Sequence, residues 1–447
     1  MNSDLIIIGS GPGGYKAAEY AAKAGLQVVV VERKELGGTC LNRGCIPTKA
    51  LARHAALFDD LHEADAFGVV DLHYRIDFSR IMARKQQVVD TLRQGVEFLM
   101  SQPGITMVYG EAAFKDAHTV SVAGAGEFTA PYIIIATGAK PKRLFPDCVT
   151  SDELLQTDHV PRRLCIIGAG VIGMEFASIF SSFGSEVTVV EYLDECLPMV
   201  DADVAKRLRT QLKRRGVTFH VGAAVKEVSA AGVRFERKGK ELTVEADMVL
   251  AATGRAPEVD GLHLELAGVA VEKQGVVVDD DLRTSEPHIY AIGDVNGRCQ
   301  LAHAATAQGL HAVRCILAAL KGAESLPEIP RMAAQPVPAA VFTHPELAFV
   351  GRQAACKARV NYRANGKALA LGEPDGLLDL YADADGRITG CTCLGTHAAD
   401  LVQEVSALMG KGTTVAELRQ MIHIHPTVSE LLVDAANQLS AVCNTVS

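Results

Sequence analysis

One local pattern occurs twice in this chain and restricts the fold more than any other feature. Each copy is an apolar run that leads into glycines spaced GxGxxG, then a helix-favouring segment, then a second apolar run that ends in an acid. The first copy, from LIIIGSGPGG to QVVVVE, contains Gly9, Gly11, Gly14 and Glu32. The second, LCIIGAGVIGMEFASIFSSFGSEVTVVE, contains Gly168, Gly170, Gly173 and Glu191. In both copies 23 positions separate the first glycine from the acid.

This pattern predicts two βαβ units that each bind a dinucleotide. The first glycine permits the tight turn, the second lets the backbone approach a pyrophosphate, and the third lets helix and strand pack closely. The N-terminus of the helix offers N–H groups to the phosphates. The acid accepts hydrogen bonds from a ribose 2′-hydroxyl and repels a 2′-phosphate. Glu191 therefore favours NAD over NADP in the second unit, and no arginine follows it in YLDECLPMVDAD.

A second type of turn accompanies each unit. YIIIATGAKP and MVLAATGRAP are predicted strands that run into Thr-Gly, at Thr137 and Gly138 and at Thr253 and Gly254. Glycine permits backbone conformations that let the chain pass close to a ligand. The sequence thus predicts an α/β fold with two Rossmann-like dinucleotide-binding domains.

Length and composition exclude several classes of protein. A chain of 447 residues is too long for one core and predicts roughly two to four domains. The net charge of −9 argues against a nucleic-acid partner, and no apolar run reaches the ~18 residues of a membrane helix. The eleven cysteines, mostly isolated in apolar segments, are typical of a reducing compartment. Because the first predicted strand starts at Asp4, we expect no targeting segment and a cytoplasmic location.

The segment GGTCLNRGCIPTK places Cys40 and Cys45 beside the first nucleotide site. Their spacing does not suit zinc, and no second pair of ligands lies nearby, so we predict no metal ion. A structural bridge does not suit a reducing compartment, and a redox pair is favoured. On a regular helix positions i and i+5 lie ~8–9 Å apart, beyond the ~7 Å limit for a disulfide. We therefore expect Gly44 and Pro47 to distort the segment. Arg43 either favours the thiolate or is an exposed turn residue.

Several motifs together resemble the class I flavoprotein disulfide reductase family. GGTCLNRGCIPTK resembles its redox-active disulfide motif, the first GxGxxG its FAD fingerprint, and TSEPHIYAIGDVNG its second FAD motif. PVPAAVFTHPELAFVG resembles the start of its interface domain, and HIHPTVSE its catalytic His-Glu element. The resemblance covers essentially the whole chain.

The resemblance implies a role for each matching residue. Cys40 would exchange with a dithiol substrate, and Cys45 would lie nearer the flavin and pass electrons to it. His425 would be the general base, with Glu430 holding its imidazole in the right tautomer.

The resemblance also implies cofactor contacts. Lys49 matches a lysine near flavin N5, Glu175 matches its ion-pair partner, and Asp294 matches an acid that binds the ribityl and phosphate portion of FAD. Four further residues match positions whose backbone contacts a cofactor in the family, with weaker individual support. They are Gly110 and Ala302 for FAD, and Val225 and Gly254 for NAD.

The implied activity is that of an FAD-dependent, NAD-linked oxidoreductase that oxidises a protein-bound dihydrolipoamide. Its partner would be a lipoylated carrier protein of a 2-oxo acid dehydrogenase complex or of the glycine cleavage system. In this family the C-terminal histidine reaches the disulfide of the other subunit, which implies an obligate homodimer. We expect an FAD domain over residues 1–145, an NAD domain over 146–262, a central domain over 263–330 that completes the FAD site, and an α+β interface domain over 331–447.

Two other functions stay open. One is a related reductase of another disulfide or of a metal ion that uses NADPH; Glu191 and the single C-terminal Cys443 weigh against it. The other is a flavin-binding scaffold without catalysis, which the intact cysteine and histidine motifs disfavour. The interface domain looks shorter than the family pattern, with a reduced helix and edge strand. We interpret Cys391 and Cys393 as buried small residues on opposite faces of a strand rather than as a second redox site.

Overall fold

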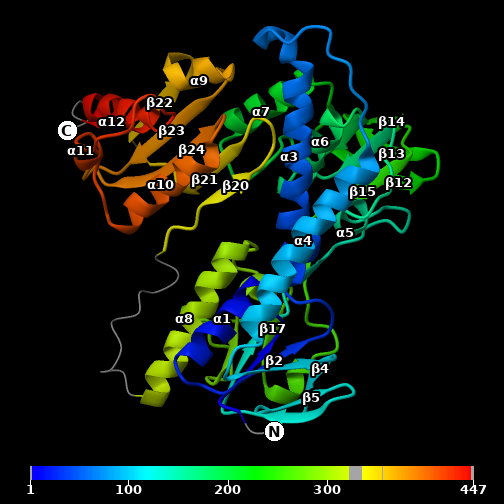
Figure 1. The fold of residues 1–447 in the computed structure, drawn as a ribbon, viewed down its shortest axis with the longest axis vertical. Coiled ribbons are helices and arrows are strands. Elements are labelled where there is room, and N and C mark those ends of the chain that lie inside the picture. The colour runs from blue at the N-terminus through cyan, green and yellow to red at the C-terminus, as the bar shows by residue number, and fades with distance from the viewer. Residues whose placement is uncertain (1–2, 322–334, 355, 444–447) are drawn as a thin grey trace.

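The computed structural model describes residues 3–321, 335–354 and 356–443, which form three α/β units (Figure 1). The N-terminal unit lies at the bottom of Figure 1, a second unit at the upper right and the C-terminal unit at the upper left. Two long helices, α3 (Cys45–His62) and α4 (Phe78–Met100), run from the N-terminal unit towards the second one. Within the described part of the chain, no helix is long and apolar enough to span a membrane.

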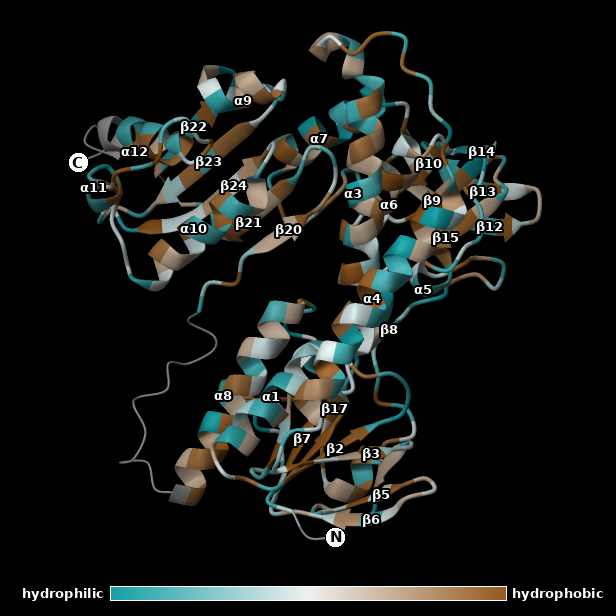
Figure 2. Ribbon diagram, in the orientation of Figure 1, coloured by the Kyte–Doolittle hydropathy of each residue, from teal (hydrophilic) through white to brown (hydrophobic). Residues whose placement is uncertain are grey.

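The N-terminal unit is built on a parallel sheet in the order β19-β7-β1-β2-β3. Its strands are β1 (Leu5–Ile8), β2 (Val28–Glu32), β3 (Ile105–Tyr109), β7 (Tyr132–Ile135) and β19 (Ile289–Ala291). Leu5 and Ile7 of β1 pack towards α4, α1 (Pro12–Lys23) and α8 (Ala302–Lys321). Ile6 and Ile8 pack on the opposite face, against β4 (Ala112–Phe114), β5 (Thr119–Val122) and β6 (Gly126–Thr129). Because both faces are covered, these strands are apolar along their length (Figure 2).

The second unit repeats this plan. Its parallel sheet has the order β11-β10-β9-β15, from β9 (Arg163–Ile167), β10 (Glu186–Val190), β11 (Thr218–His220) and β15 (Met248–Ala251). Helices α6 (Val171–Ser182) and α7 (Ala202–Arg214) pack on one face. The other face meets the antiparallel strands β12 (Ala223–Ser229), β13 (Gly232–Arg237) and β14 (Lys240–Val244). In both units the chain adds strands first to one side of the first strand and later to its other side. Ligands bind at the carboxyl end of the strand where the order reverses in this way.

The two Thr-Gly turns lead into strands that join the units. After Gly138 the chain forms β8 (Ala139–Pro141), and after Gly254 it forms β16 (Arg255–Pro257), and these strands pair antiparallel. The units also meet through α3 and α6, where the ring centroids of Phe58 and Phe183 lie 5.6 Å apart. A short helix, α5 (Ser151–Leu154), leads into the second unit. After β16 the chain returns to the first unit and supplies β19 and α8 to it.

The C-terminal unit is an antiparallel sheet in the order β20-β21-β24-β23-β22. Its strands are β20 (Ala339–Val341), β21 (Leu347–Gly351), β22 (Cys356–Asn361), β23 (Leu377–Ala382) and β24 (Ile388–Leu394). Its helices are α9 (Gly366–Leu371), α10 (Ala398–Gly410), α11 (Val415–Leu418) and α12 (Glu430–Cys443). An edge strand is present, because β22 pairs with β23 along all of its residues. The side chain of Cys443 lies outside the described residues.

Cys391 and Cys393 are both buried in β24, as predicted, with 1% and 0% of their surface exposed. Both belong to the core between the sheet and the helices α10 and α12. Side chains two positions apart on a strand point to the same face, so the prediction of opposite faces is wrong. Burial raises the pKa of both thiols, which leaves them as neutral packing groups.

Candidate active site

The cysteine segment folds as two helices that break at a glycine. Cys40 lies in α2 (Gly38–Arg43), and Cys45 is the first residue of α3. Between them Gly44 has φ −146° and ψ −116°, and a Cβ there would lie 2.9 Å from the carbonyl oxygen of Thr39. This confirms the distortion expected at Gly44. Pro47 is not the cause of the break, because it lies in the first turn of α3. Backbone N–H groups there have no partner within the helix, so a proline costs no hydrogen bond.

The two sulfurs differ electrostatically. Both cysteines are thiols in this structure and contact each other. A hydrogen bond from Cys40 lowers the pKa of the Cys45 thiol, aided by the charge of Lys49 and opposed by burial. The same hydrogen bond, together with burial, raises the pKa of Cys40. Cys45 is therefore the sulfur that more readily holds negative charge.

The charge that acts on Cys45 is fixed by an ion pair between units. Lys49 Nζ lies 2.8 Å from both carboxylate oxygens of Glu175, which is 4% exposed in α6. The backbone N–H of Phe342, from the C-terminal unit, also donates to Glu175 at 2.9 Å. The Phe342 ring lies under the ammonium group, 4.5 Å from ring centroid to Nζ. All three units thus meet beside the cysteine pair.

Substitutions of the two partners of this ion pair are expected to shift the pKa of the Cys45 thiol in opposite directions. In reduced enzyme, Lys49→Met should raise the pKa of the Cys45 thiol, because the ammonium group favours the thiolate. Glu175→Gln should lower it, because the carboxylate disfavours the thiolate. Thiolate ultraviolet absorbance measured against pH gives both values. Shifts in the same direction in both variants would contradict this electrostatic assignment.

Arg43 is the last residue of α2, and its guanidinium forms an ion pair with Glu35. Its side chain is 23% exposed and lines the cavity, so it is not an exposed turn residue. Lys49 is a cation that lowers the pKa of the Cys45 thiol. An effect of Arg43 on the thiolate stays a prediction.

A cavity of about 790 Å³ extends from the first glycine turn to the cysteine pair. This size is within the range of ~300–1,000 Å³ for cofactor pockets. The cavity wall contains all the residues that the sequence assigned to FAD or to the disulfide, namely Gly9, Gly11, Gly14, Glu32, Cys40, Cys45, Lys49, Gly110, Thr137, Gly138, Glu175, Asp294 and Ala302. Segments far apart in sequence thus converge on one space.

The walls of this cavity fit a flavin dinucleotide. A Cβ on Gly38 would lie 2.6 Å from the Cα of Gly11, so glycines bring the start of α2 against the phosphate turn. The N–H and hydroxyl of Ser10 donate to Glu32, leaving the acid at the cavity edge. Burial raises the pKa of Asp294, whereas the charge of Arg255 opposes that rise. These groups offer hydrogen bonds to a ribose, a pyrophosphate and a ribityl chain.

The second nucleotide turn has the same internal bonds as the first. Glu191 accepts hydrogen bonds from the backbone N–H of Ala169 and from that of Leu193, the latter at 2.7 Å. Glu32 accepts the equivalent bonds from the N–H groups of Ser10 and Lys34. A Cβ on Gly173 would lie 1.9 Å from the carbonyl oxygen of Gly168, so helix and strand meet only through glycine. The predicted NAD residues lie at this end of the second unit: Gly168, Gly170 and Glu191 after β9 and β10, Gly173 in α6, Val225 in β12 and Gly254 after β15.

The predicted base lies far from the cysteines of its own chain. His425 Nδ1 is 2.9 Å from Glu430 Oε1, and the histidine side chain is 80% exposed. This bond, with a further one from the N–H of Thr427, lowers the pKa of Glu430. Neither His425 nor Glu430 is among the described residues that line the cavity. In Figure 1 they belong to the corner formed by α11 and α12 at the left edge, whereas α3 is central.

The surface around His425 is apolar. Ile422 is 100% exposed and Ile424 is 79% exposed. The other histidine of this segment, His423, is buried and bonds Glu404 at 2.9 Å. A largely exposed pair of isoleucines beside a carboxylate-bound imidazole is unusual for a free surface and typical of an interface.

Sequence patterns missed two residues of the cavity wall. Phe342 caps the Lys49–Glu175 pair, and Arg255 lies opposite Asp294. The dipeptides in which they occur, VF before THP and GR before AP, are too short to indicate a ligand contact. These two residues line the cavity only because the units pack against one another.

Comparison with known families and structures agrees with this geometry. Residues 3–309 match the family model described as pyridine nucleotide-disulphide oxidoreductase, and residues 337–436 match its dimerisation domain. The chain is 37% identical to dihydrolipoyl dehydrogenase of Bacillus subtilis, with 97% of each chain covered. It is 39% identical to dihydrolipoyl dehydrogenase of Mycobacterium tuberculosis, with 96% of each covered.

Among solved structures, the chain is similar to the HOCl-induced flavoprotein disulfide reductase RclA of Escherichia coli. The TM-score is 0.84 at 31% identity, with 97% of this chain and 99% of the other covered. A Cu(II) complex of the same reductase matches with the same TM-score.

Proposed function

Because the chain belongs to the pyridine nucleotide-disulphide oxidoreductase family, we propose that it is an FAD- and NAD-dependent dihydrolipoyl dehydrogenase. The observation that carries the proposal is the pair of unequal sulfurs beside the Lys49–Glu175 ion pair, on the wall of a cavity that fits FAD. The substrate is a dihydrolipoyl group on a carrier protein. The names of the similar enzymes support this choice of substrate.

The order of the thiol steps follows from the difference in pKa between Cys40 and Cys45. In the oxidised enzyme, one substrate thiolate attacks Cys40 in the Cys40–Cys45 disulfide, and Cys45 leaves as a thiolate. A thiol of low pKa is the better leaving group, and Lys49 stabilises the charge that Cys45 acquires. The second substrate thiolate then attacks the sulfur bonded to Cys40, forming the lipoyl disulfide and releasing Cys40. Two electrons have moved from the substrate to the cysteine pair.

Two protons leave the substrate thiols during these steps. Glu430 accepts a hydrogen bond from Nδ1–H of His425, which leaves Nε2 free to accept one proton. The other proton goes to Cys40 when it is released, because its pKa is raised. FAD, when bound, supplies the two-electron acceptor between the cysteine pair and NAD. Gly9, Gly11, Gly14, Glu32 and Asp294 would hold it.

We place the base in the other subunit of a homodimer. A dimerisation domain matches residues 337–436, which include His425 and Glu430. His425 lies outside its own cavity wall and beside exposed isoleucines. An arrangement in which each subunit lends this histidine to the other accounts for both facts.

Preference for NAD is expected to depend on the charge of Glu191. Glu191→Gln keeps the size of the side chain but removes the charge that repels a 2′-phosphate. The ratio of kcat/KM for NAD to that for NADP should fall about tenfold or more, in line with ~1.5–3 kcal/mol for a charged hydrogen bond. Glu32→Gln, in the equivalent position of the first unit, is the matched control and should leave the ratio unchanged. If Glu191→Gln left this ratio unchanged, the charge of Glu191 would not determine the preference for NAD.

The direct test is anaerobic reduction by dihydrolipoamide. The flavin absorbance of the holoenzyme should bleach or shift to the red of a thiolate charge-transfer contact, and NAD should then restore it. A protein that stays unchanged with dihydrolipoamide but reacts with NADPH and another disulfide or Cu(II) would be the related reductase instead. A protein unchanged by all of these would be a flavin-binding scaffold.

A further inference from the structure

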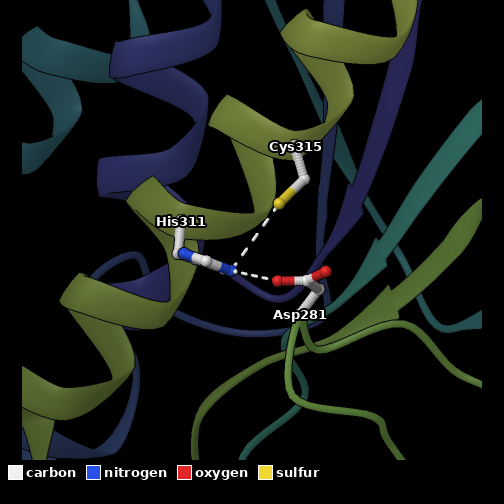
Figure 3. Close-up of side chains that lie close together, drawn as sticks. All are labelled: Asp281, His311 and Cys315. Carbon is white, nitrogen blue, oxygen red and sulfur yellow. Dashed lines mark hydrogen bonds and ion pairs between the residues drawn. The ribbon is translucent and has the colours of Figure 1, made fainter. Parts of the chain in front are cut away.

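Three side chains of metal-ligand type converge on α8, away from the cysteine pair (Figure 3). His311 and Cys315 lie one helical turn apart, and Asp281 faces them from the loop between β18 (Gly275–Val276) and β19. His311 Nε2 is 3.2 Å from Asp281 Oδ1 and 3.6 Å from Cys315 Sγ. All three donor atoms lie within 4.8 Å of one another. Ala305, which lines the cavity, lies six positions before His311 on α8, which is ~9 Å along the helix axis.

Hydrogen bonds alone satisfy this cluster poorly. A protonated Nε2 donates to the carboxylate of Asp281 but has no lone pair to accept from the thiol of Cys315. An unprotonated Nε2 accepts from the thiol but then directs its lone pair at the carboxylate oxygen. A cation at the centre accepts lone pairs from all three groups at once.

The two distances from His311 Nε2 match those around a tetrahedral zinc ion, and the third separation is within 4.8 Å. Zinc binds nitrogen at ~2.0–2.1 Å, carboxylate oxygen at ~2.0–2.2 Å and thiolate sulfur at ~2.3 Å. At tetrahedral angles these lengths place nitrogen and oxygen ~3.4 Å apart, and nitrogen and sulfur ~3.6 Å apart. The observed distances are 3.2 Å and 3.6 Å. Magnesium and calcium prefer oxygen ligands only, so a mixed nitrogen, sulfur and oxygen set selects zinc.

The ligands are held in place before any ion arrives. A Cβ on Gly309 would lie 2.6 Å from the carbonyl oxygen of Gly13, so α8 is packed directly on α1. On the other side, Asp279 Oδ1 accepts from the N–H groups of Asp281 and Arg283, at 2.9 Å each, which fixes the loop. Ligands on rigid segments bind without paying the entropy of ordering.

The cluster is also accessible from one side. His311 and Cys315 are 4% and 6% exposed, whereas the side chain of Asp281 is 40% exposed. Solvent therefore reaches the cluster on the side of Asp281, where a water molecule would be the fourth ligand. Arg283 Nη1 lies 3.6 Å from Asp281 Oδ2, the oxygen that His311 does not contact, and its charge weakens the attraction for a cation.

We propose that Asp281, His311 and Cys315 bind one Zn²⁺ ion per chain, with water as the fourth ligand. On binding, the Cys315 thiol gives its proton to solvent and the thiolate bonds the metal. The ion ties α8 to the loop that leads through β19 to Asp294, and it stabilises the first unit without taking part in the thiol chemistry. The prediction of no metal ion rested on the spacing of Cys40 and Cys45, and the 30 positions between Asp281 and His311 give no local motif.

Cobalt is the probe that reports sulfur ligation. We would use metal-stripped, FAD-loaded full-length protein carrying Cys45→Ser, so that the cysteine pair cannot chelate the ion through two sulfurs. Co²⁺ should bind with a stoichiometry of one per chain, produce thiolate-to-cobalt charge-transfer absorption, and be displaced by Zn²⁺. The absence of this absorption would overturn the proposal.

Variants locate the site. Adding Cys315→Ser should remove the charge-transfer absorption. Asp281→Asn, which changes an accessible loop and spares the helix packing, should weaken Co²⁺ binding by at least ~10- to 100-fold. Cys356→Ser, another buried thiol at 4% exposure, is the control and should leave binding unchanged. Absorption that survives both Cys315→Ser and Asp281→Asn would place the metal elsewhere and contradict the assignment.

Discussion

Replacing Cys45 by serine is expected to lower lipoamide-linked NAD reduction by about 10⁴-fold or more, while FAD stays bound. The magnitude is that of losing a residue on which covalent chemistry depends. Serine keeps the size of the side chain at the start of α3 but forms no disulfide, so electrons from the substrate have no route to the flavin. Steady-state assays with dihydrolipoamide and NAD, beside flavin absorbance, measure both quantities.

Cys40→Ser is the matched variant and should differ in colour. Its activity should fall as far, but a serine hydroxyl at position 40 still donates a hydrogen bond to the sulfur of Cys45. The Cys45 thiolate therefore persists at neutral pH, since Lys49 also remains. We expect charge-transfer absorption in Cys40→Ser and none in Cys45→Ser. The reverse pattern would exchange the roles of the two sulfurs, and retained activity in either variant would refute the disulfide relay.

Replacing His425 by alanine is expected to lower kcat by roughly 10²- to 10⁴-fold, the usual contribution of a general base. Glu430→Gln should have a smaller effect, because it leaves the imidazole in place and removes only the carboxylate bonded to Nδ1. Neither residue lines the cavity, so flavin content should not change.

A mixed dimer tests whether the base comes from the other subunit. One subunit carries Cys45→Ser and the other carries His425→Ala, and each is inactive as a homodimer. If the histidine serves the opposite subunit, the mixed dimer contains one site with both groups intact. Random association of equal amounts should then give roughly a quarter of wild-type activity. A mixture that stays inactive, although dimers are shown to exchange, would place the base within its own chain.

Local sequence carries much of the fold. The third glycine of each GxGxxG turn is required by a contact five residues away, such as the 1.9 Å that would separate a Cβ on Gly173 from the oxygen of Gly168. The unbroken apolar runs of β1 and β2 are required by burial on both faces. The break between α2 and α3 follows from Gly44. Each of these is a short-range constraint, so the residue pattern records it.

Contacts between units are not recorded in this way. The charge beside Cys45 comes from Lys49, whose pairing with Glu175 and Phe342 needs three units to meet. Arg43, which is nearer to both cysteines in sequence, pairs with Glu35 instead. The faces of Cys391 and Cys393 were also misjudged, although the period of a strand decides them.

By itself the sequence determined two nucleotide-binding units, a redox pair of cysteines and a histidine with its acid, because each is a local motif with its own spacing. Only the tertiary structure decided which sulfur carries charge, that His425 lies outside its own cavity wall, and that Asp281 meets His311 and Cys315. The physical reason is that charge and coordination depend on distances in space, and these distances are set by segments as far apart as Lys49 and Phe342.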